Sequence, residues 1–203
     1  MAVGMRRVSA ISQSDATQKV SDSHRSRYVA RPRCRSAKLA RVSAAETFHA
    51  LVGDLEYPMF IVTAQAGDER LGCLVGFATQ MSIDPPRFAV CLSHSNRTYR
   101  RARDAQVLGV HCVPAHAREL AELFGGETTD EVDKFARAAW HAGPHGVPIL
   151  DECPNWFVGR VIWRRDAGDH DAFLLEPVAA ERGTGEDEFT FHRARRIDPG
   201  HPA

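Results

Sequence analysis

The stretch that decides the fold is residues 72–86, which read Gly72-Cys73-Leu74-Val75-Gly76-Phe77-Ala78-Thr79-Gln80-Met81-Ser82-Ile83-Asp84-Pro85-Pro86. It predicts one strand from Leu71 to Ser82 that ends at the Asp84-Pro85-Pro86 turn, because proline lacks the backbone donor that a strand needs. Two glycines four residues apart weaken a strand. They therefore indicate either a bulge or barrel corner, or the close approach of a flat ligand or another strand.

Strand patterns surround this stretch on both sides. We expect further strands at 59–64, 88–92, 107–113, 156–163 and 172–180, and a last edge strand at 189–196. Helices are expected at 44–52, 99–105, 116–124 and 128–139. The first of them would place Phe48, Leu51 and Val52 on one face. Short strands separated by turns, without strict strand–helix alternation, predict a mainly β protein with short helices, built as an antiparallel barrel.

Charge is distributed unevenly along the 203 residues. Residues 1–43 contain ten basic and two acidic residues, a net charge of +8, whereas residues 44–203 have a net charge of −8. The first segment is rich in serine and has no helical or strand periodicity, which predicts a disordered basic N-terminal extension. An organelle transit peptide and a binding arm are the alternatives. Residues 44–203 are expected to form the domain.

Composition excludes several classes of protein. The 26 basic and 26 acidic residues cancel, which argues against a uniformly basic nucleic-acid-binding protein. No apolar run approaches the length of a membrane span, so no membrane partner is expected. The five cysteines are widely spaced and include no Cys-x-x-Cys pair, which favours a reducing cytoplasm over a disulfide framework or a zinc site. His141 and His145 have the spacing of a helical metal pair, but Gly143-Pro144 breaks the helix, so no metal is expected.

Two polar segments are candidates for chemistry. Residues 93–98, Ser93-His94-Ser95-Asn96-Arg97-Thr98, combine hydroxyls, an amide and a guanidinium before a predicted helix. They suit either a phosphate site or a simple helix cap with a surface arginine. Residues 168–171, Gly168-Asp169-His170-Asp171, place an imidazole between two carboxylates. That histidine either titrates near neutrality beside a cofactor or belongs to an ordinary turn.

Together these segments resemble the flavin reductase family, the FMN-binding split-barrel proteins. The matching segments, in family order, are 57–64, 72–82, 82–86, 95–98, 120–124 with Phe135, 146–150 and 168–170. The most specific combination is Ser-x-Asp-Pro-Pro after a glycine-bearing strand, followed about 85 residues later by Gly-Asp-His. The resemblance covers residues 44–180 and implies an antiparallel split β-barrel.

The resemblance also implies which residues form the site. The flavin ring and ribityl chain would lie along Gly76, Phe77, Ala78, Thr79, Gln80 and Ser82. The phosphate would be held by Ser93, His94, Ser95, Asn96 and Thr98, with Arg97 as a cationic aid and Arg100 and Arg101 nearby. His170 would stand beside the nicotinamide or the flavin edge as the catalytic residue. Members of the family typically form homodimers.

One departure from the family concerns the strand itself. Many members read Thr-Ala-Asn-Ser-Phe where this chain has Leu74-Val75-Gly76-Phe77-Ala78. The change removes side-chain hydrogen bonds, each worth about 0.5–1.5 kcal/mol. Weak FMN binding, FAD or a deazaflavin therefore stay open as alternatives to tight FMN binding.

The expected function is NAD(P)H-dependent reduction of FMN, with a monooxygenase as the partner that receives reduced flavin. In such enzymes the cofactor performs the chemistry, while the protein supplies binding, orientation and exclusion of water. The alternatives are a flavin- or haem-binding carrier or sensor without turnover, and a tight flavoprotein or deazaflavin-dependent oxidoreductase on the same barrel.

Overall fold

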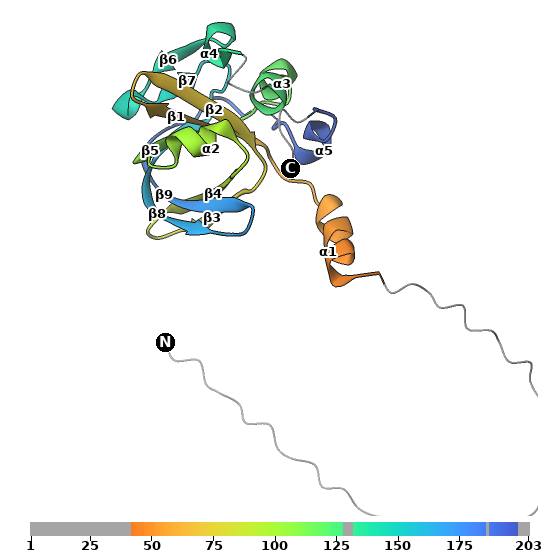
Figure 1. The fold of residues 1–203 in the computed structure, drawn as a ribbon. Coiled ribbons are helices and arrows are strands. Elements are labelled where there is room, and N and C mark those ends of the chain that lie inside the picture. Colours follow the sequence, from red (N-terminus) through yellow and green to blue (C-terminus); the bar gives the residue numbers. More distant parts are fainter. Residues whose placement is uncertain (1–41, 128–131, 186, 199–203) are drawn as a thin grey trace, which may run out of the picture. The chain divides into compact units, whose positions relative to one another are not determined.

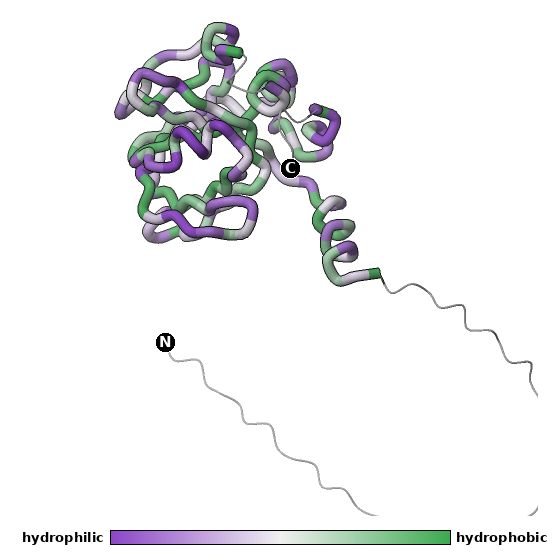
Figure 2. The backbone as a smooth tube through the Cα atoms, viewed as in Figure 1, coloured by the Kyte–Doolittle hydropathy of each residue, from purple (hydrophilic) through white to green (hydrophobic). Residues whose placement is uncertain are grey.

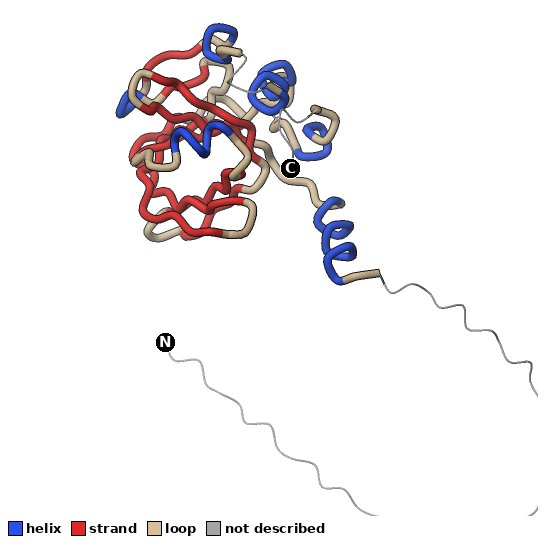
Figure 3. The backbone as a smooth tube through the Cα atoms, in the orientation of Figure 1, coloured by secondary structure: helices blue, strands red, loops and turns tan. Residues whose placement is uncertain are grey.

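Antiparallel strands dominate the protein, with short helices between them (Figures 1 and 3). The computed structural model describes residues 42–127, 132–185 and 187–198. The strands are β1 (Phe60–Ala66), β2 (Glu69–Val75), β3 (Ala78–Ser82), β4 (Arg87–Ser93), β5 (Val107–Cys112), β6 (Trp140–Ala142), β7 (Pro148–Leu150), β8 (Trp156–Asp166) and β9 (His170–Glu181). The helices are α1 (Ala44–Gly53), α2 (Arg97–Ala102), α3 (Arg118–Gly126), α4 (Lys134–Arg137) and α5 (Phe191–Ala194), with a 3₁₀ turn, η1, at Pro144–Gly146.

Seven strands form one antiparallel sheet in the order β2-β1-β5-β8-β9-β4-β3. The two strands at the ends of this order, β2 and β3, are consecutive in the chain and are joined only by Gly76 and Phe77. The sheet must therefore curl until its two edges meet at this link. The topology confirms the predicted mainly β, antiparallel class, and the curled sheet is open between β2 and β3 rather than hydrogen-bonded there.

The long β8–β9 hairpin makes the curl possible. Residues 156–160 of β8 pair with β5, whereas residues 170–175 of β9 pair with β4, so the two halves of the hairpin belong to opposite sides of the sheet. The register between β8 and β9 shifts at Val158/Gly159 and again at Val161/Trp163. Such bulges bend a strand and increase its twist, which lets one hairpin serve both sides.

The prediction of one strand from Leu71 to Ser82 is wrong. The chain leaves the sheet at Gly76 and Phe77, and β2 pairs with β1 whereas β3 pairs with β4. After the break, the amide of Cys91 donates to the Phe77 carbonyl over 2.8 Å, which starts the new pairing. Gly76 therefore marks a barrel corner, as one of the two alternatives for the glycines predicted.

Two further predictions from the sequence need correction. The predicted 189–196 edge strand is instead an extended entry at 187–190 followed by helix α5, because that segment pairs only through the isolated bridges Pro58–Thr190 and Pro114–Glu188. The predicted 128–139 helix is reduced to α4, capped by Asp133, and its expected start at Thr128 lies outside the described residues. The β6–β7 hairpin, between α4 and β8, was not predicted from the sequence.

Strand β1 is buried on both of its faces, which explains its continuous apolar sequence. Phe60, Val62 and Ala64 face the interior of the curled sheet, where they meet residues of β2, β4, β5 and β9. Met59 and Ile61 face the other way, toward α3 and α4 and toward Phe189. Figure 1 shows this division, with α3, α4 and the β6–β7 hairpin beside β1 and β2, and β3, β4, β8 and β9 on the opposite side.

None of the residues of helix α1 is buried. Hydrophobic and hydrophilic residues alternate along it (Figure 2), and Phe48 and Leu51 are each 59% exposed. The predicted helix at 44–52 is confirmed, but its apolar face does not pack into the core. Residues 1–41 of the predicted basic extension lie outside the described residues. No helix in the described part of the chain is both long enough and apolar enough to span a membrane.

A fully buried histidine joins three strands. His111 on β5 uses Nδ1 to donate to the Ile61 carbonyl over 3.0 Å, while its Nε2 accepts from the Leu150 amide over 3.2 Å. Both nitrogens are therefore satisfied only in the neutral form. Burial lowers the pKa of His111 from 6.5 to about 4, against the effect of the Ile61 hydrogen bond.

This pKa predicts acid destabilisation. The unfolded chain protonates His111 below pH 6.5, whereas the folded chain resists protonation down to about pH 4, so the free energy of unfolding should fall as pH falls through that window. The expected loss between pH 7 and pH 5 is about 2 kcal/mol. Urea unfolding at both values measures it. His111→Gln, whose amide cannot titrate, should lose less over the same interval, and an equal loss in both proteins would contradict this assignment.

Candidate functional site

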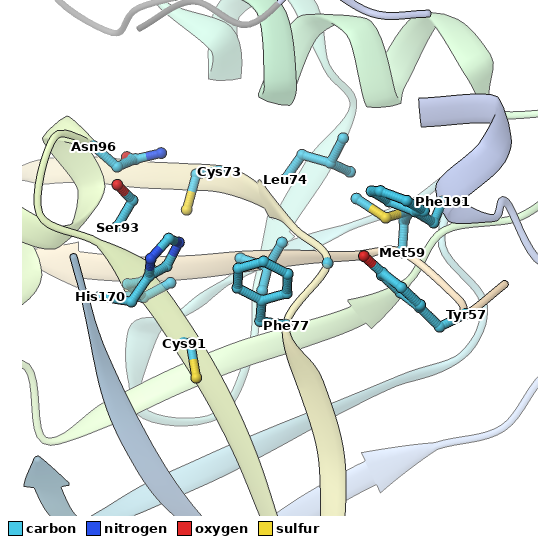
Figure 4. A pocket seen from close by; sticks show the side chains of 13 residues that line it. Tyr57, Met59, Cys73, Leu74, Phe77, Cys91, Ser93, Asn96, His170 and Phe191 are labelled. Carbon is cyan, nitrogen blue, oxygen red and sulfur yellow. The ribbon is translucent and has the colours of Figure 1, made fainter. Parts of the chain in front are cut away.

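A cavity of about 250 Å³ opens where the chain breaks between β2 and β3. Its lining comes from the ends of several elements that are distant in sequence: Tyr57, Met59, Cys73, Leu74, Val75, Gly76, Phe77, Cys91, Leu92, Ser93, Asn96, His170 and Phe191. Figure 4 shows Ser93, Asn96 and His170 on one side of Phe77, and Tyr57, Met59 and Phe191 on the other. The cavity thus has a polar end and an aromatic end.

The polar end is the loop between β4 and α2. The Asn96 side chain caps α2 by accepting from the Thr98 amide over 2.8 Å, and the Asn96 amide donates to the Ser93 carbonyl over 3.0 Å. The Ser93 and Ser95 hydroxyls lie 2.9 Å apart. Arg100 reaches back to donate to the Ser95 carbonyl over 2.5 Å, which holds a guanidinium beside these groups. The loop thus gathers hydroxyls, an amide and one cation.

His170 begins β9, immediately after the tight turn that follows β8. Gly168 has a φ of +113°, a conformation that other residues rarely adopt, and its amide donates to Asp166 over 2.8 Å. His170 Nδ1 lies 2.7 Å from Asp169 Oδ1. Because an ionised carboxylate only accepts, Nδ1 must donate, and a neutral His170 keeps its lone pair on Nε2. The same hydrogen bond and the nearby imidazole charge lower the pKa of Asp169.

The His170 ring packs against Phe77, with ring centroids 5.2 Å apart and an angle of 55° between the planes. Phe77 itself is 57% exposed, because it lies on the short link between β2 and β3. The imidazole is therefore held from two sides, by Asp169 and by Phe77, at the boundary between the polar and aromatic ends.

The aromatic end depends on the C-terminal segment. Phe189 is 1% exposed and is bonded on both sides, since its amide donates to Val113 and its carbonyl accepts from Met59. This anchoring carries Phe191 to the cavity, where its ring stacks on Tyr57 at 4.6 Å and 18°. Two aromatic rings, from positions 57 and 191, thereby form one wall.

Gly76 keeps the aromatic end open. A Cβ at this position would lie 3.2 Å from a Tyr57 ring carbon, closer than ordinary van der Waals contact, and 3.4 Å from the Met59 sulfur. The missing side chain therefore leaves a gap that any other residue would fill.

The structure brings together some of the predicted site residues and separates the others. Those that line the cavity are Gly76, Phe77, Ser93, Asn96 and His170. Those that do not are Ala78, Thr79, Gln80 and Ser82 on the edge strand β3, together with His94, Ser95, Arg97 and Thr98. Ser95 nevertheless contacts the cavity loop through Ser93, and the Thr98 hydroxyl is buried without a hydrogen bond among the described residues.

The arginines predicted near the phosphate also differ in what they bind. Arg97 and Arg101 both bind Glu69 of β2, over 2.5 and 2.9 Å, and these hydrogen bonds lower the pKa of Glu69. Their guanidinium groups are thus directed to the β1–β2 hairpin rather than into the cavity. Arg100 is bonded to the loop through the Ser95 carbonyl.

Sequence reasoning missed eight lining residues: Tyr57, Met59, Cys73, Leu74, Val75, Cys91, Leu92 and Phe191. Burial raises the pKa of Cys73 to about 11 and also raises that of Cys91, so both remain protonated thiols at neutral pH. Leu74 could be found from its place two residues before Gly76. Phe191 could not, because only the tertiary fold brings it there.

The curled antiparallel sheet, with one cavity at the strand break, defines a small ligand-binding split barrel. The model of the flavin reductase like domain family matches residues 52–200. The chain therefore belongs to that family, as the resemblance implied.

Individual relatives agree with this assignment. The chain is 27% identical over 135 residues to the FMN reductase (NADH) RutF of Agrobacterium fabrum, covering 66% of this chain and 77% of that protein. It is 30% identical over 148 residues to the reductase component of a 4-nitrophenol 4-monooxygenase/4-nitrocatechol 2-monooxygenase from Rhodococcus opacus, covering 73% and 77%. Among solved structures, the NADH:FAD oxidoreductase SgcE6 of Streptomyces globisporus superposes with a TM-score of 0.68 at 22% identity, covering 79% of this chain and 95% of that one.

Asn96 both lines the cavity and caps α2, and the cap gives a testable prediction. Asn96→Ala removes the cap of α2 and should lower the free energy of unfolding by about 1 kcal/mol. Asn96→Ser keeps a capping oxygen and should restore most of that stability. Chemical unfolding of the three proteins decides the matter, and equal stability of the alanine and serine variants would show that the cap contributes nothing.

Proposed function

We propose that the protein is an NAD(P)H-dependent flavin reductase whose cavity holds FMN. The observation that carries this proposal is the two-ended cavity, in which a hydroxyl- and amide-bearing loop with a guanidinium faces an aromatic wall across His170. Membership of the flavin reductase like domain family and the activities in the names of the relatives support it.

The residues present suit a flavin mononucleotide. The Ser93 hydroxyl, the Asn96 amide and Arg100 match a phosphate or ribityl hydroxyls. Tyr57, Phe191 and the gap at Gly76 match a flat aromatic ring, which must approach the backbone closely. These contacts do not use the polar side chains that many family members have at the positions of Leu74, Gly76 and Phe77. The predicted contacts along β3, at Thr79 and Gln80, are not part of the proposal.

When bound, flavin accepts hydride from NAD(P)H and passes electrons to an acceptor. The protein's own residues supply binding and orientation. Tyr57, Phe191 and Leu74 exclude water from the aromatic end. His170, fixed by Asp169 and Phe77, would present Nε2 as a hydrogen-bonding group toward a bound ring.

A monooxygenase is the proposed recipient of reduced flavin. The relative from Rhodococcus opacus is named as the reductase component of such a system. A cytoplasmic location, predicted from the cysteines, belongs to the same proposal, and Cys73, Cys91, Cys112 and Cys153 are all free.

The direct test uses the purified full-length chain. Its visible spectrum is recorded with and without added FMN, and NADH or NADPH oxidation is then followed with excess FMN. We expect a flavin spectrum on FMN addition and flavin-dependent oxidation of one or both nicotinamides. Flavin binding without oxidation would identify a carrier, and absence of flavin binding at about 1 mM FMN would refute the proposal.

His170→Ala tests the role of the imidazole. Turnover should fall at least about tenfold, because the group at the ring edge is lost, while FMN affinity changes little. His141→Ala is the matched control, since His141 forms a similar pair with Asp151, at 2.6 Å, outside the cavity. Stopped-flow reduction and flavin titration separate the two effects. Full activity of His170→Ala would remove this residue from the mechanism.

We also propose that the protein is a homodimer. In the dimer, a second copy would cover the exposed apolar residues of α1, Phe48 and Leu51. An isolated helix of ten residues is marginal in water, and α1 buries none of its residues in the monomer. A second copy of the chain, which supplies the same surface in return, would stabilise both helices.

Light scattering tests this assembly. The full chain should have twice the mass of one copy, and Leu51→Asp should shift it toward the monomer. Val178→Asp, at another exposed apolar position (41% exposed), should remain dimeric. A monomeric wild-type protein, or a dimer unaffected by Leu51→Asp, would contradict the proposal.

A further inference from the structure

Lys134, the first residue of α4, is a buried cation. The residue is 4% exposed, and no other lysine, arginine, aspartate or glutamate in the described part of the chain is buried. Its ammonium donates to the Phe124 carbonyl over 3.2 Å and to the Gly72 carbonyl over 3.5 Å, and it lies 5.5 Å from the centre of the Phe124 ring. Lys134 does not line the cavity, and the contacts proposed for FMN do not use it.

The charge of Lys134 is not neutralised by a carboxylate. Within residues 42–127, 132–185 and 187–198, no acidic side chain is in ion-pair contact with the ammonium. Burial lowers the pKa of Lys134, and Glu127 acts in the opposite direction, but both oxygens of Glu127 already accept from Arg137. The Phe124 carbonyl belongs to the last turn of α3, where the helix dipole favours a cation. Backbone dipoles thus offset part of the cost of burying this charge.

Packing at this place does not require a charge. The Phe124 and Phe135 rings meet edge to face at 5.6 Å, and a Cβ at Gly72 would lie 2.6 Å from Phe124 and 3.4 Å from Phe135. These rings therefore already hold α3 and α4 against β2. A neutral side chain would complete the contact without the desolvation cost of an ammonium. An anion that binds nearby would explain why the position carries a cation.

Strand β2 connects the ammonium to the polar end of the cavity. Gly72, whose carbonyl accepts from Lys134, is followed by Cys73, which lines the cavity on the same side of Phe77 as the loop between β4 and α2 (Figure 4). Burial raises the pKa of Cys73 to about 11, whereas the Lys134 ammonium and the Thr98 hydroxyl both act to lower it. The ammonium, the thiol and the hydroxyl therefore lie close to one another.

The polar end of the cavity therefore has cations of two kinds. Arg100 is exposed, and it is bonded to the loop through the Ser95 carbonyl. Lys134 is buried behind the strand that carries Cys73. Salt screens an exposed charge strongly and a buried charge much less. A buried ammonium can therefore attract an anion in the cavity without touching it.

We propose that Lys134 determines specificity for a flavin that carries a phosphate, through the charge of its buried ammonium. The proposal rests on the proposed function, which identifies the ligand as a flavin. FMN and riboflavin have the same ring and ribityl chain and differ only in the phosphate, which carries a charge of about −1.5 to −2. The charge of Lys134 therefore acts on the ratio of the two affinities, whereas packing around Lys134 acts on both affinities alike.

The test is isothermal titration calorimetry of the full chain with FMN and with riboflavin. Lys134→Met has a similar length and no charge, and it should weaken FMN binding about tenfold while riboflavin affinity changes less than about twofold. Lys134→Gln keeps donors for the two carbonyls and should show the same selective loss. Arg118→Met is the matched control, because it removes an equal charge from the exposed start of α3, where Arg118 pairs with Glu122 over 2.7 Å. This control should keep the affinity ratio of the wild type.

The wild-type protein provides a second test that does not depend on the folding of a variant. It should bind FMN more tightly than riboflavin, and this preference should persist in about 1 M salt, where exposed charges are screened. Equal affinity for the two flavins, or a preference that high salt abolishes, would overturn the proposal. An equal loss of both affinities in the Lys134 variants, or an unchanged ratio, would also overturn it, because Lys134 would then act by packing alone.

NAD(P)H oxidation, measured separately, distinguishes this proposal from the proposed function. A protein that prefers FMN through Lys134 but does not oxidise NAD(P)H would refute the reductase and leave the role of Lys134 standing. An active reductase whose FMN preference survives Lys134→Met and Lys134→Gln would retain the proposed function and refute the role of Lys134.

Discussion

The break in the chain at Gly76 and Phe77 is the constraint on which the rest of the structure depends. It converts what would be one long strand into the two edges of the curled sheet, β2 and β3. Because the edges are covalently joined but not hydrogen-bonded to each other, the sheet closes around its core and still leaves an opening. The candidate site lies at that opening, so the irregularity that permits the fold also creates the cavity. A regular strand from 71 to 82 would provide neither.

Local chemistry made part of this organisation predictable. The proline turn, the Asn96 cap and the glycine turn before His170 each depend on residues close in sequence, and the structure has all three. The strand break was not predictable in this way, because a glycine in an apolar run fits a bulge as well as a corner. Only the competition between pairing with β1 and pairing with β4 decides where the chain leaves the sheet.

The site residues show the same difference between what local sequence determines and what long-range packing determines. Ser93, Asn96 and His170 were found because their loops hold the relevant groups together. Arg97 lies in the same loop, yet Glu69 binds it from a distant hairpin, and sequence proximity carries no information on such a competitor. Phe191 was missed for the opposite reason, since its segment reads as an edge strand until Phe189 is buried between Met59 and Val113. Long-range packing therefore determined which of the predicted groups face the cavity and which unpredicted ones join them.

The end of the β4–β9 ladder shows how side chains on two faces can share one structural support. A single pair of strand ends directs Ser93 and His170 to one face and His94 and Asp171 to the other. The His94–Asp171–Tyr99 hydrogen bonds on the second face and the His170–Asp169 bond on the first fix the same turn. The position of this turn is therefore determined by hydrogen bonds on both of its faces at once.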